Sequence, residues 1–325
     1  MEDEFGFIRK ITPKQHHQES LQEGIGDDAA IWRPIKDSEQ VVCLDTMTEG
    51  VHFTRRTMSP AQVGHKALAA NLSDLAAMGA VPEFYLVSIA IPPSWNENEL
   101  REIYEGMDSL ALQYSVDLIG GDTVSTEGPL VVSVTVIGRV ENGVRLLRKN
   151  ARAGDVVFIT GVLGESAAGL SLLLNNKLSD DVKPLLAAHQ TPMPHIKEGR
   201  LLAGLKQRIA LNDVSDGLAS ELHEIAEPSA VSIEIERDKL PVSEHLEKFN
   251  SEQQLNWMLY GGEDYKLAGT ASLETFEAMK QQFEECDLQI FQIGRVTEKQ
   301  SAFVYITDSN GKRALEKKGY NHFKK

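Results

Sequence analysis

Seven aspartates that lie beside glycine or in short polar turns constrain this chain more than any other feature of its sequence. They occur in five segments, namely GIGDDAA (24–30), LDTMTEGVHF (44–53), NLSDLAAMG (71–79), IGGDT (119–123) and DVSDG (213–217). Carboxylates held close together repel one another unless cations lie between them. Mg²⁺ binds one or two carboxylates and fills its remaining positions with water and phosphate oxygens. The pattern therefore predicts a fold that presents single aspartates to several Mg²⁺ ions, which bridge a polyphosphate.

Length and composition favour an enzyme of about two domains, since the chain has 325 residues. Its 42% of hydrophobic and 25% of charged residues are ordinary for such a protein. The formal net charge of −15 argues against a nucleic-acid partner, because such partners require a basic protein surface. An anionic substrate must therefore be screened locally by cations.

The two cysteines, Cys43 and Cys286, belong to no CxxC motif and no Cys/His cluster, which argues against zinc and against a disulfide framework. The first ten residues, MEDEFGFIRK, lack the basic and then apolar pattern of a signal peptide. The apolar runs are also too short to span a bilayer. We therefore expect a cytoplasmic protein without a membrane partner.

Strands and helices alternate in the first part of the chain. Val and Ile are abundant at 84–91 and 130–140, which predicts strands, and a short apolar run predicts another strand with Asp45 at its end. Apolar residues recur at helical spacing at 97–114 and again after the start signal Ser59-Pro60.

The segment at 141–155 is basic and rich in turn residues, and it predicts the passage into a second unit. Beyond it, helices are predicted at 164–175 and directly after DVSDG. Further strands are predicted at 156–160, 232–235, 265–270, 289–296 and 303–307.

Well-known phosphate and calcium motifs do not explain these segments. GIGDDA fits the dinucleotide pattern G-x-G-x-x-G/A superficially, but Asp27 and Asp28 would direct negative charge at a pyrophosphate. The chain has no Walker A loop and no HRD or DFG signature of protein kinases. None of the Asp turns has the acid spacing of an EF-hand, which weakens a calcium-buffering role.

Each of these segments also has a purely structural interpretation. Asp27 and Asp28 suit an ordinary turn, and an isolated helical aspartate such as Asp74 is usually solvated. One acid of DVSDG is explained by capping of the following helix, whereas the second requires another cause, for which a metal is the simplest. The paired glycines before Asp122 favour close approach of backbone to a ligand after a strand.

GGED (261–264) repeats the Gly-Gly-acid pattern in the second unit, where a hairpin-like turn is the structural alternative. Arg148 and Lys149 are either solvated charges or contacts for a nucleotide phosphate. A lone histidine such as His52 is more often structural than catalytic.

In an ordered set of motifs the chain closely resembles the thiamine-monophosphate kinase family, whose superfamily includes aminoimidazole ribonucleotide synthetase and selenophosphate synthetase. The motifs are GIGDDAA, LDT…GVHF, NLSDLAAMGA, GGDT, DVSDG, GGEDY and KGYNHF, and they extend over residues 24–323. NLSDLAAMGA and GGDT mark the superfamily. GVHF, GGEDY and the final GY-N-HF favour this kinase within it.

The resemblance implies direct transfer of the γ-phosphoryl group of ATP to thiamine monophosphate, which gives thiamine diphosphate and ADP. It implies an α/β plus α+β fold of two domains. The first, at 1–140, has a mixed sheet, binds ATP and Mg²⁺ and forms a homodimer. The second, at 150–325, is α+β and closes the active-site cleft. Another synthetase of the superfamily and a non-catalytic Mg-nucleotide-binding protein remain as alternatives.

The resemblance also implies the roles of individual residues. Magnesium ligands are Asp28, Asp45, Asp74, Asp122, Asp213 and Asp216, of which Asp74, Asp122 and Asp213 are the predicted catalytic residues. The ATP contacts are Tyr104, Gly121, Asp122, Arg148 and Ser215. The substrate contacts are His52, Glu263 and Tyr320. The chain departs from the family pattern at Cys43 and Leu44, where Ser or Thr is frequent, and at Lys317, where an aromatic residue sometimes precedes KGY.

Overall fold

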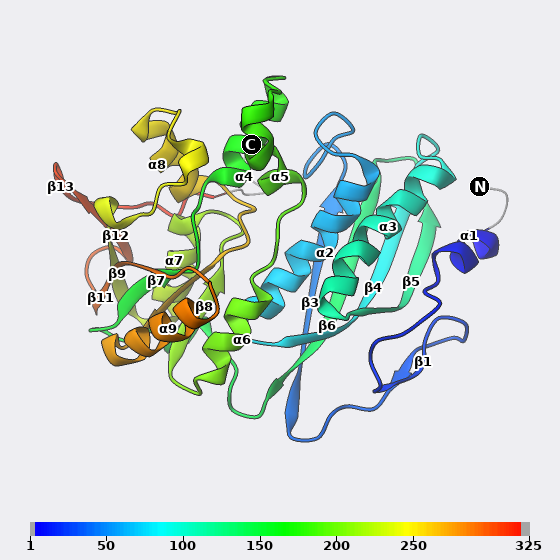
Figure 1. The fold of residues 1–325 in the computed structure, drawn as a ribbon, viewed down its shortest axis with the longest axis horizontal. Coiled ribbons are helices and arrows are strands. Elements are labelled where there is room, and N and C mark those ends of the chain that lie inside the picture. Colours follow the sequence, from blue (N-terminus) through cyan, green and yellow to red (C-terminus); the bar gives the residue numbers. More distant parts are fainter. Residues whose placement is uncertain (1–3, 320–325) are drawn as a thin grey trace. The chain divides into compact units, whose positions relative to one another are not determined.

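Residues 4–319 are the part of the chain that the computed structural model describes (Figure 1), and they divide into two units. Unit 1 comprises the residues up to Leu75 together with Val81–Asn142. Unit 2 comprises Ala76–Ala80 together with the residues from Gly143 onward. Over the described residues, every helix is too short or too polar to cross a membrane.

Unit 1 is built on a mixed four-stranded sheet with the order β3-β6-β4-β5, in which only β4 and β5 run parallel. Every second residue of β6 is buried, as expected for a strand with one face on a core. A short pair, β1 (Leu21–Glu23) and β2 (Ile31–Trp32), stands apart from this sheet. The sheet strands are β3 (Ser38–Thr48), β4 (Val81–Ile91), β5 (Asp117–Ser125) and β6 (Val131–Glu141).

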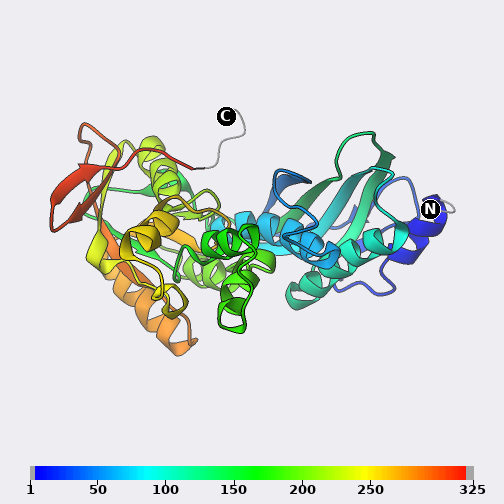
Figure 2. The ribbon, with the colours of Figure 1, turned by 90° about the horizontal axis from the view of Figure 1, so that it is seen from above.

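Two helices, α2 (Pro60–Ala77) and α3 (Glu97–Tyr114), cover one face of this sheet, as Figure 2 shows, and α1 (Glu4–Ile11) precedes them in the chain. The α3 helix begins at a capping box, because Asn96 accepts from the backbone of Glu99 while the Glu99 side chain accepts from Asn96. The predicted apolar stripe of α3 is buried, which confirms its sequence assignment; it contains Leu100, Ile103, Tyr104, Met107, Leu110 and Ala111.

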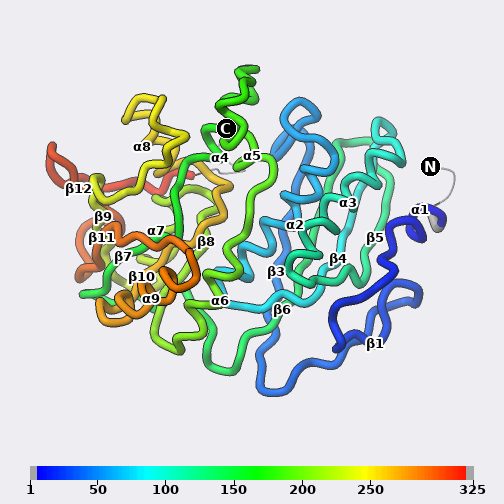
Figure 3. The backbone as a smooth tube through the Cα atoms, in the orientation of Figure 1, coloured from blue at the N-terminus to red at the C-terminus, as the bar shows by residue number. Residues whose placement is uncertain are grey.

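Unit 2 contains a seven-stranded sheet with the order β13-β12-β9-β11-β7-β10-β8. Only β12 and β9 pair in parallel, and Figure 3 shows them side by side although β10 and β11 separate them in the sequence. The strands are β7 (Val156–Ile159), β8 (Ile209–Asp213), β9 (Val231–Glu236), β10 (Leu267–Ala271), β11 (Phe291–Glu298), β12 (Val304–Asp308) and β13 (Gly311–Ala314).

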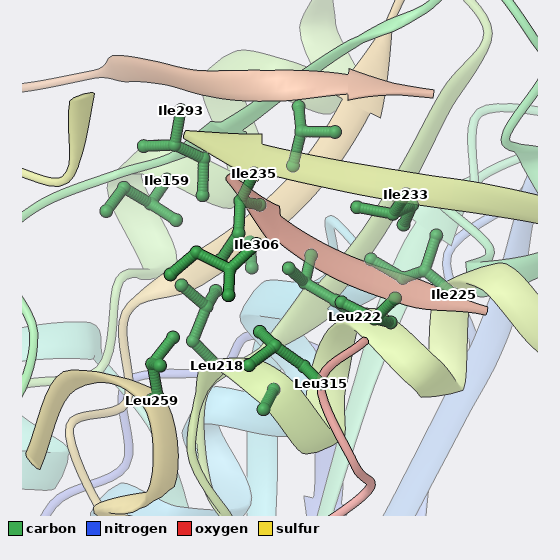
Figure 4. Close-up of a cluster of buried hydrophobic side chains, with 14 of the residues drawn as sticks. Ile159, Leu218, Leu222, Ile225, Ile233, Ile235, Leu259, Ile293, Ile306 and Leu315 are labelled. Carbon is green, nitrogen blue, oxygen red and sulfur yellow. The ribbon is translucent and has the colours of Figure 1, made fainter. Parts of the chain in front are cut away.

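The core of unit 2 lies between this sheet and α7, whose Leu222 and Ile225 meet Ile233 and Ile306 of the sheet (Figure 4). Burial of each such side chain stabilises the fold by about 1.5–3 kcal/mol. The helices of the unit are α4 (Glu165–Leu174), α5 (Lys183–Gln190), α6 (Ile196–Gly204), α7 (Leu218–Ser229), α8 (Ser251–Tyr260) and α9 (Leu273–Glu285), with 3-10 turns at Arg148–Asn150, Asp180–Val182, Arg237–Lys239 and Glu244–Leu246.

The fold class is as predicted, with a mixed sheet and helices in unit 1 and an α+β arrangement in unit 2. Two local predictions were wrong. Asp45 lies inside β3 rather than at its end, because β3 stays paired with β6 up to Thr48. Gly121 and Asp122 lie inside β5 rather than after a strand. A Cβ atom on Gly121 would lie 2.1 Å from the Val87 carbonyl oxygen, so close strand packing already requires this glycine.

Candidate active site

The first candidate group in unit 1 joins β3 to α2 through Asn71, whose side chain is buried. The Asn71 Oδ1 atom accepts from the backbone N–H of Asp45 at 3.0 Å, and its Nδ2 atom donates to the Ala67 carbonyl at 3.0 Å. The Cys43 thiol donates to the Asn71 carbonyl at 3.3 Å. One turn further along α2 comes Asp74, whose side chain hydrogen-bonds with that of Asp45. Asn71 therefore ties β3 at Asp45 to helix α2, which carries Asp74.

The electrostatics of this pair favour a bound cation. Burial raises the pKa of Asp45, while hydrogen bonding with Asp74 and the nearby His52 ring oppose that increase. Burial, and then the charges of Asp74 and Asp45, raise the pKa of the Cys43 thiol, so this thiol stays protonated. Two carboxylates in contact cannot both be ionised without a counter-charge. The pair offers hard oxygen donors, which is the ligand type that Mg²⁺ prefers.

His52 lies in the turn after β3 and is held by the backbone. Its Nδ1 atom accepts from the N–H of Thr48 at 3.0 Å, and its own N–H donates to the Thr48 carbonyl at 2.9 Å. Because Nδ1 acts as an acceptor, a neutral ring carries its proton on Nε2. Nε2 is then the atom with which His52 can donate to a ligand.

The remaining predicted residues of unit 1 lie in other places. Asp122 pairs with Ser88 in the β4–β5 ladder, and both are exposed. Asp28 is exposed in a turn, where its N–H donates to Asp27 Oδ1 at 2.8 Å. Tyr104 is buried on α3, and its ring contacts Phe7 edge-on with centroids 5.8 Å apart. Between residues 4 and 319, no three His, Cys, Asp or Glu side chains are gathered so that they could hold a metal.

In unit 2 the DVSDG loop begins at the last residue of β8, which is Asp213. This aspartate is buried. The loop lies against the GGEDYK segment through three backbone hydrogen bonds. Val214 N–H donates to the Lys266 carbonyl at 2.7 Å, and Tyr265 N–H donates to the Val214 carbonyl at 3.0 Å. Glu263 N–H donates to the Ser215 carbonyl at 2.7 Å. Two motifs that are distant in sequence thus form one surface.

The GGEDY loop has an unusual backbone. Glu263 and Tyr265 have φ angles of 65° and 50°, which lie in the left-handed region. A non-glycine residue there costs roughly 1–2 kcal/mol. The preceding Gly262 is required by proximity, because a Cβ atom would lie 2.3 Å from the Ser215 carbonyl oxygen. Such strain persists only where the surroundings enforce it, and it is concentrated at binding sites.

Asp264, between the two strained residues, anchors the loop. Its carboxyl is buried and accepts from Gly164 N–H at 2.6 Å and from Ser166 N–H at 3.1 Å, at the start of α4. Burial raises the pKa of Asp264 to about 7, although both backbone hydrogen bonds oppose the increase. The predicted substrate residue Glu263 points a carboxylate oxygen to within 3.4 Å of Nδ1 of the buried His189.

Arg148, a predicted ATP contact, is fixed at both ends of its guanidinium. Its Nε atom donates to Asn212 Oδ1 at 2.8 Å, and NH1 donates to Glu224 at 3.2 Å. The same Asn212 donates to the buried carboxyl of Glu221. Burial and the charge of Asp213 raise the pKa of Glu221 to about 8.

Two of the three residues at which the sequence departs from the family pattern, Cys43 and Lys317, have structural contacts. Cys43 contacts Asn71, as described, whereas Leu44 is exposed on the opposite face of β3. Lys317 forms ion pairs with Glu224 and Glu227 of α7. Tyr320, a predicted substrate contact, lies outside the described residues.

Sequence reasoning missed four buried residues that position the predicted ones: Asn71, Asn212, Glu221 and Asp264. The first two carried a signal, since each asparagine stands in an aspartate motif, in NLSD and directly before DVSDG. Asp264 is adjacent to Glu263 within GGED. Glu221 gave no signal, because a glutamate in the first turn of a helix is ordinary.

Comparison with known proteins defines the class. The model of the N-terminal domain of AIR synthase related proteins matches residues 26–140, and that of their C-terminal domain matches residues 152–307. A thiamine-monophosphate kinase of Bacillus subtilis (strain 168) is 50% identical over 328 residues, which cover 99% of this chain and 100% of the relative.

Solved structures agree. The thiamine-monophosphate kinase of Stenotrophomonas maltophilia K279a superposes with a TM-score of 0.82 and 35% identity, over 89% of this chain and 92% of that one. AaThiL complexed with AMPPCP and TMP superposes with a TM-score of 0.77 and 32% identity, over 98% of this chain and 97% of that one. The chain therefore belongs to the AIR synthase related proteins and, among them, to the thiamine-monophosphate kinase family.

Proposed function

We propose that this chain transfers the γ-phosphoryl group of ATP to the phosphate of thiamine monophosphate, with help from Mg²⁺. This proposal rests on the likeness of the whole chain to thiamine-monophosphate kinases. One of the similar solved structures is complexed with AMPPCP and TMP. A phosphate oxygen of the acceptor forms a bond to the γ-phosphorus as the bond from that phosphorus to the β,γ-bridging oxygen breaks. ADP leaves with the bonding electrons, and thiamine diphosphate is formed.

The phosphoryl transfer requires screening of negative charge more than it requires a general base. Both reactants are anions, and the acceptor oxygen is already largely ionised at neutral pH, so alignment and charge stabilisation are the main contributions. When bound, Mg²⁺ neutralises charge on the phosphates. We assign it to Asp45 and Asp74, which are in contact, and to Asp28, Asp122, Asp213 and Asp216. Asp74, Asp122 and Asp213 are the residues that we propose as catalytic.

The two substrates have separate contacts in this proposal. Arg148 and Ser215 bind ATP together with Gly121, Asp122 and Tyr104. Arg148 is suited to this role because Asn212 and Glu224 hold its guanidinium in place. His52, Glu263 and Tyr320 bind thiamine monophosphate, and Glu263 is held by the strained GGEDY loop. Unit 1 then provides most of the nucleotide and metal contacts, and unit 2 provides the others. We also propose that the reaction takes place in the cytoplasm, where ATP is available.

We further propose a homodimer through the face of the unit 1 sheet that α2 and α3 leave uncovered. Val42 and Leu44 of β3 are 67% and 60% exposed on that face. Replacing Leu44 with Glu should convert a dimer to a monomer in light scattering, because the charge would be buried at the interface. Leu112→Glu is the control, since Leu112 is 53% exposed on α3 instead. A monomeric wild-type chain would refute the dimer.

The function is tested by incubating the chain with ATP, Mg²⁺ and thiamine monophosphate. We expect thiamine diphosphate and ADP in equal amounts, and no product when EDTA removes the metal. Tight ATP binding without product would instead favour a non-catalytic nucleotide-binding protein. Release of inorganic phosphate that depends on another acceptor would favour a synthetase of the same superfamily.

A further inference from the structure

Glu221 connects the predicted ligand-binding residues of unit 2, although it lies outside every motif. It is the fourth residue of α7, and only 4% of it is exposed. One carboxyl oxygen, Oε1, accepts from Asp216 N–H at 2.9 Å and lies 3.5 Å from the Ser215 hydroxyl. The other, Oε2, accepts from the Asn212 side-chain amide.

Asn212 extends these contacts to Arg148. Its amide nitrogen donates to Glu221, and its amide oxygen accepts from Arg148 Nε at 2.8 Å. Asn212 is completely buried. If its amide rotated, the amide nitrogen would face the Arg148 guanidinium, and two donors cannot bond to each other. A continuous chain of hydrogen bonds therefore runs from Arg148 through Asn212 and Glu221 to the backbone of the DVSDG loop.

Packing alone does not explain a glutamate at this position. A carboxyl buried beside Asp213 and Asp216 loses its contact with water, and burial of a polar group is unfavourable unless hydrogen bonds replace that contact. An apolar side chain would fill the same volume without that cost. What only the carboxyl provides is two acceptor oxygens, one for the loop and one for Asn212.

We propose that Glu221 is a positioning residue for the phosphoryl transfer. It holds the DVSDG loop and, through Asn212, the Arg148 guanidinium in the arrangement that binds ATP. This inference rests on the proposed function, in which Arg148 and Ser215 contact ATP. Glu221 itself contacts neither substrate, so its loss affects ATP through the other residues of the chain of hydrogen bonds.

The first test is Glu221→Gln. The glutamine oxygen can still accept from the Asp216 N–H, but its amide nitrogen then faces the Asn212 amide nitrogen, and two donors cannot bond to each other. We expect the KM for ATP to rise about tenfold, and the Kd of AMPPCP in calorimetry to rise similarly. The KM for thiamine monophosphate should stay within about twofold, because the GGEDY loop keeps its Asp264 anchor.

A second variant restores the contact. In Glu221→Gln combined with Asn212→Asp, the new carboxylate at position 212 accepts from both Arg148 and the glutamine amide. The number of carboxyl groups in the chain of hydrogen bonds is unchanged. We expect this double variant to recover most of the affinity for ATP. If circular dichroism shows that the single variant does not fold, the double variant is compared directly with wild type.

Glu227→Gln is the matched control, because Glu227 lies on the same helix with a side chain that is 40% exposed. It should behave as wild type. The proposal is overturned if Glu221→Gln binds ATP as wild type does. It is also overturned if both KM values rise together with a fall in melting temperature, or if the double variant is no better than the single one. AMPPCP binding needs no turnover, so these results stay separate from a failure of the kinase assay itself.

Discussion

The two units present their candidate ligand-binding groups in different ways. In unit 1, Asp45 and Asp74 project from a regular strand and a regular helix, and one buried asparagine ties that strand to that helix. In unit 2, the groups lie on the DVSDG and GGEDY loops, which two buried carboxyls hold in place. Secondary structure provides rigidity in the first case. In the second, hydrogen bonds between distant segments must provide it.

This difference has an energetic consequence. The backbone of β3 and α2 is satisfied by regular hydrogen bonds, so a change at an aspartate there alters the chemistry and spares the fold. The loops of unit 2 contain two left-handed non-glycine residues and depend on buried carboxyl groups. A change at an anchor there should alter stability as well as chemistry.

The largest expected effect is a fall in kcat, at Asp74 in unit 1. Asp74→Asn removes one carboxylate from the pair with Asp45 and should lower kcat about 1,000-fold, in the range seen when one charge-stabilising group is lost. The melting temperature should stay near that of wild type, because the amide keeps the size of the side chain. Steady-state kinetics at saturating Mg²⁺ measure this, with the exposed Asp180→Asn as control. Near-normal turnover would refute the assignment of Asp74.

A smaller effect, on stability, is expected on the unit 2 side. Asp264→Ala leaves the N–H groups of Gly164 and Ser166 buried without their acceptor, and each such group costs roughly 1–3 kcal/mol. We expect a loss of about 2–4 kcal/mol in the free energy of unfolding, measured by urea denaturation. A variant as stable as wild type would show that the loop does not need this anchor.

The pH dependence of stability is a second test of Asp264 as the anchor of the GGEDY loop. The pKa of Asp264 is about 7 in the fold, against 3.8 for the ordinary group, so the folded state retains the proton more strongly. The contribution of Asp264 to stability is therefore greatest at low pH, falls as the pH rises from about 4 to about 7, and is constant above that range.

Asp264→Asn cannot ionise and should lack this slope. The difference in unfolding free energy between wild type and this variant should fall by at most about 1.4 kcal/mol per pH unit between pH 5 and pH 7. Urea denaturation at pH 5, 6, 7 and 8 measures it. A difference that is the same at all four values, or that rises with pH, would contradict the buried position of this carboxyl.

The smallest effect is expected at the surface of unit 2. Lys317→Gln breaks the ion pairs with Glu224 and Glu227, whose side chains are 36% and 40% exposed. Exposed pairs of this kind contribute about 1 kcal/mol or less. Thermal denaturation at low and high salt should show little difference between variant and wild type. A large loss would indicate that Lys317 does more than stabilise the end of α7.

Much of the fold could be predicted because its causes are local. Helix α3 is specified by its apolar spacing and its capping box, and β6 by the alternation of buried valines. The motif order also pointed to the correct family. The prediction was less accurate for Asp45 and Gly121, because the length of a strand depends on the partner with which it pairs.

By itself, then, the sequence determined the alternation of strands and helices and the family, because periodicity and motif order are encoded within short segments. The residues proposed to bind metal and phosphate follow from the same motifs. Only the tertiary structure decided how those residues are held. Asp264 reaches Gly164 across 100 positions of the chain, and Glu221 meets Arg148 only through Asn212. A buried carboxyl acquires such a role from the donors that folding places around it, and no local pattern in the sequence encodes them.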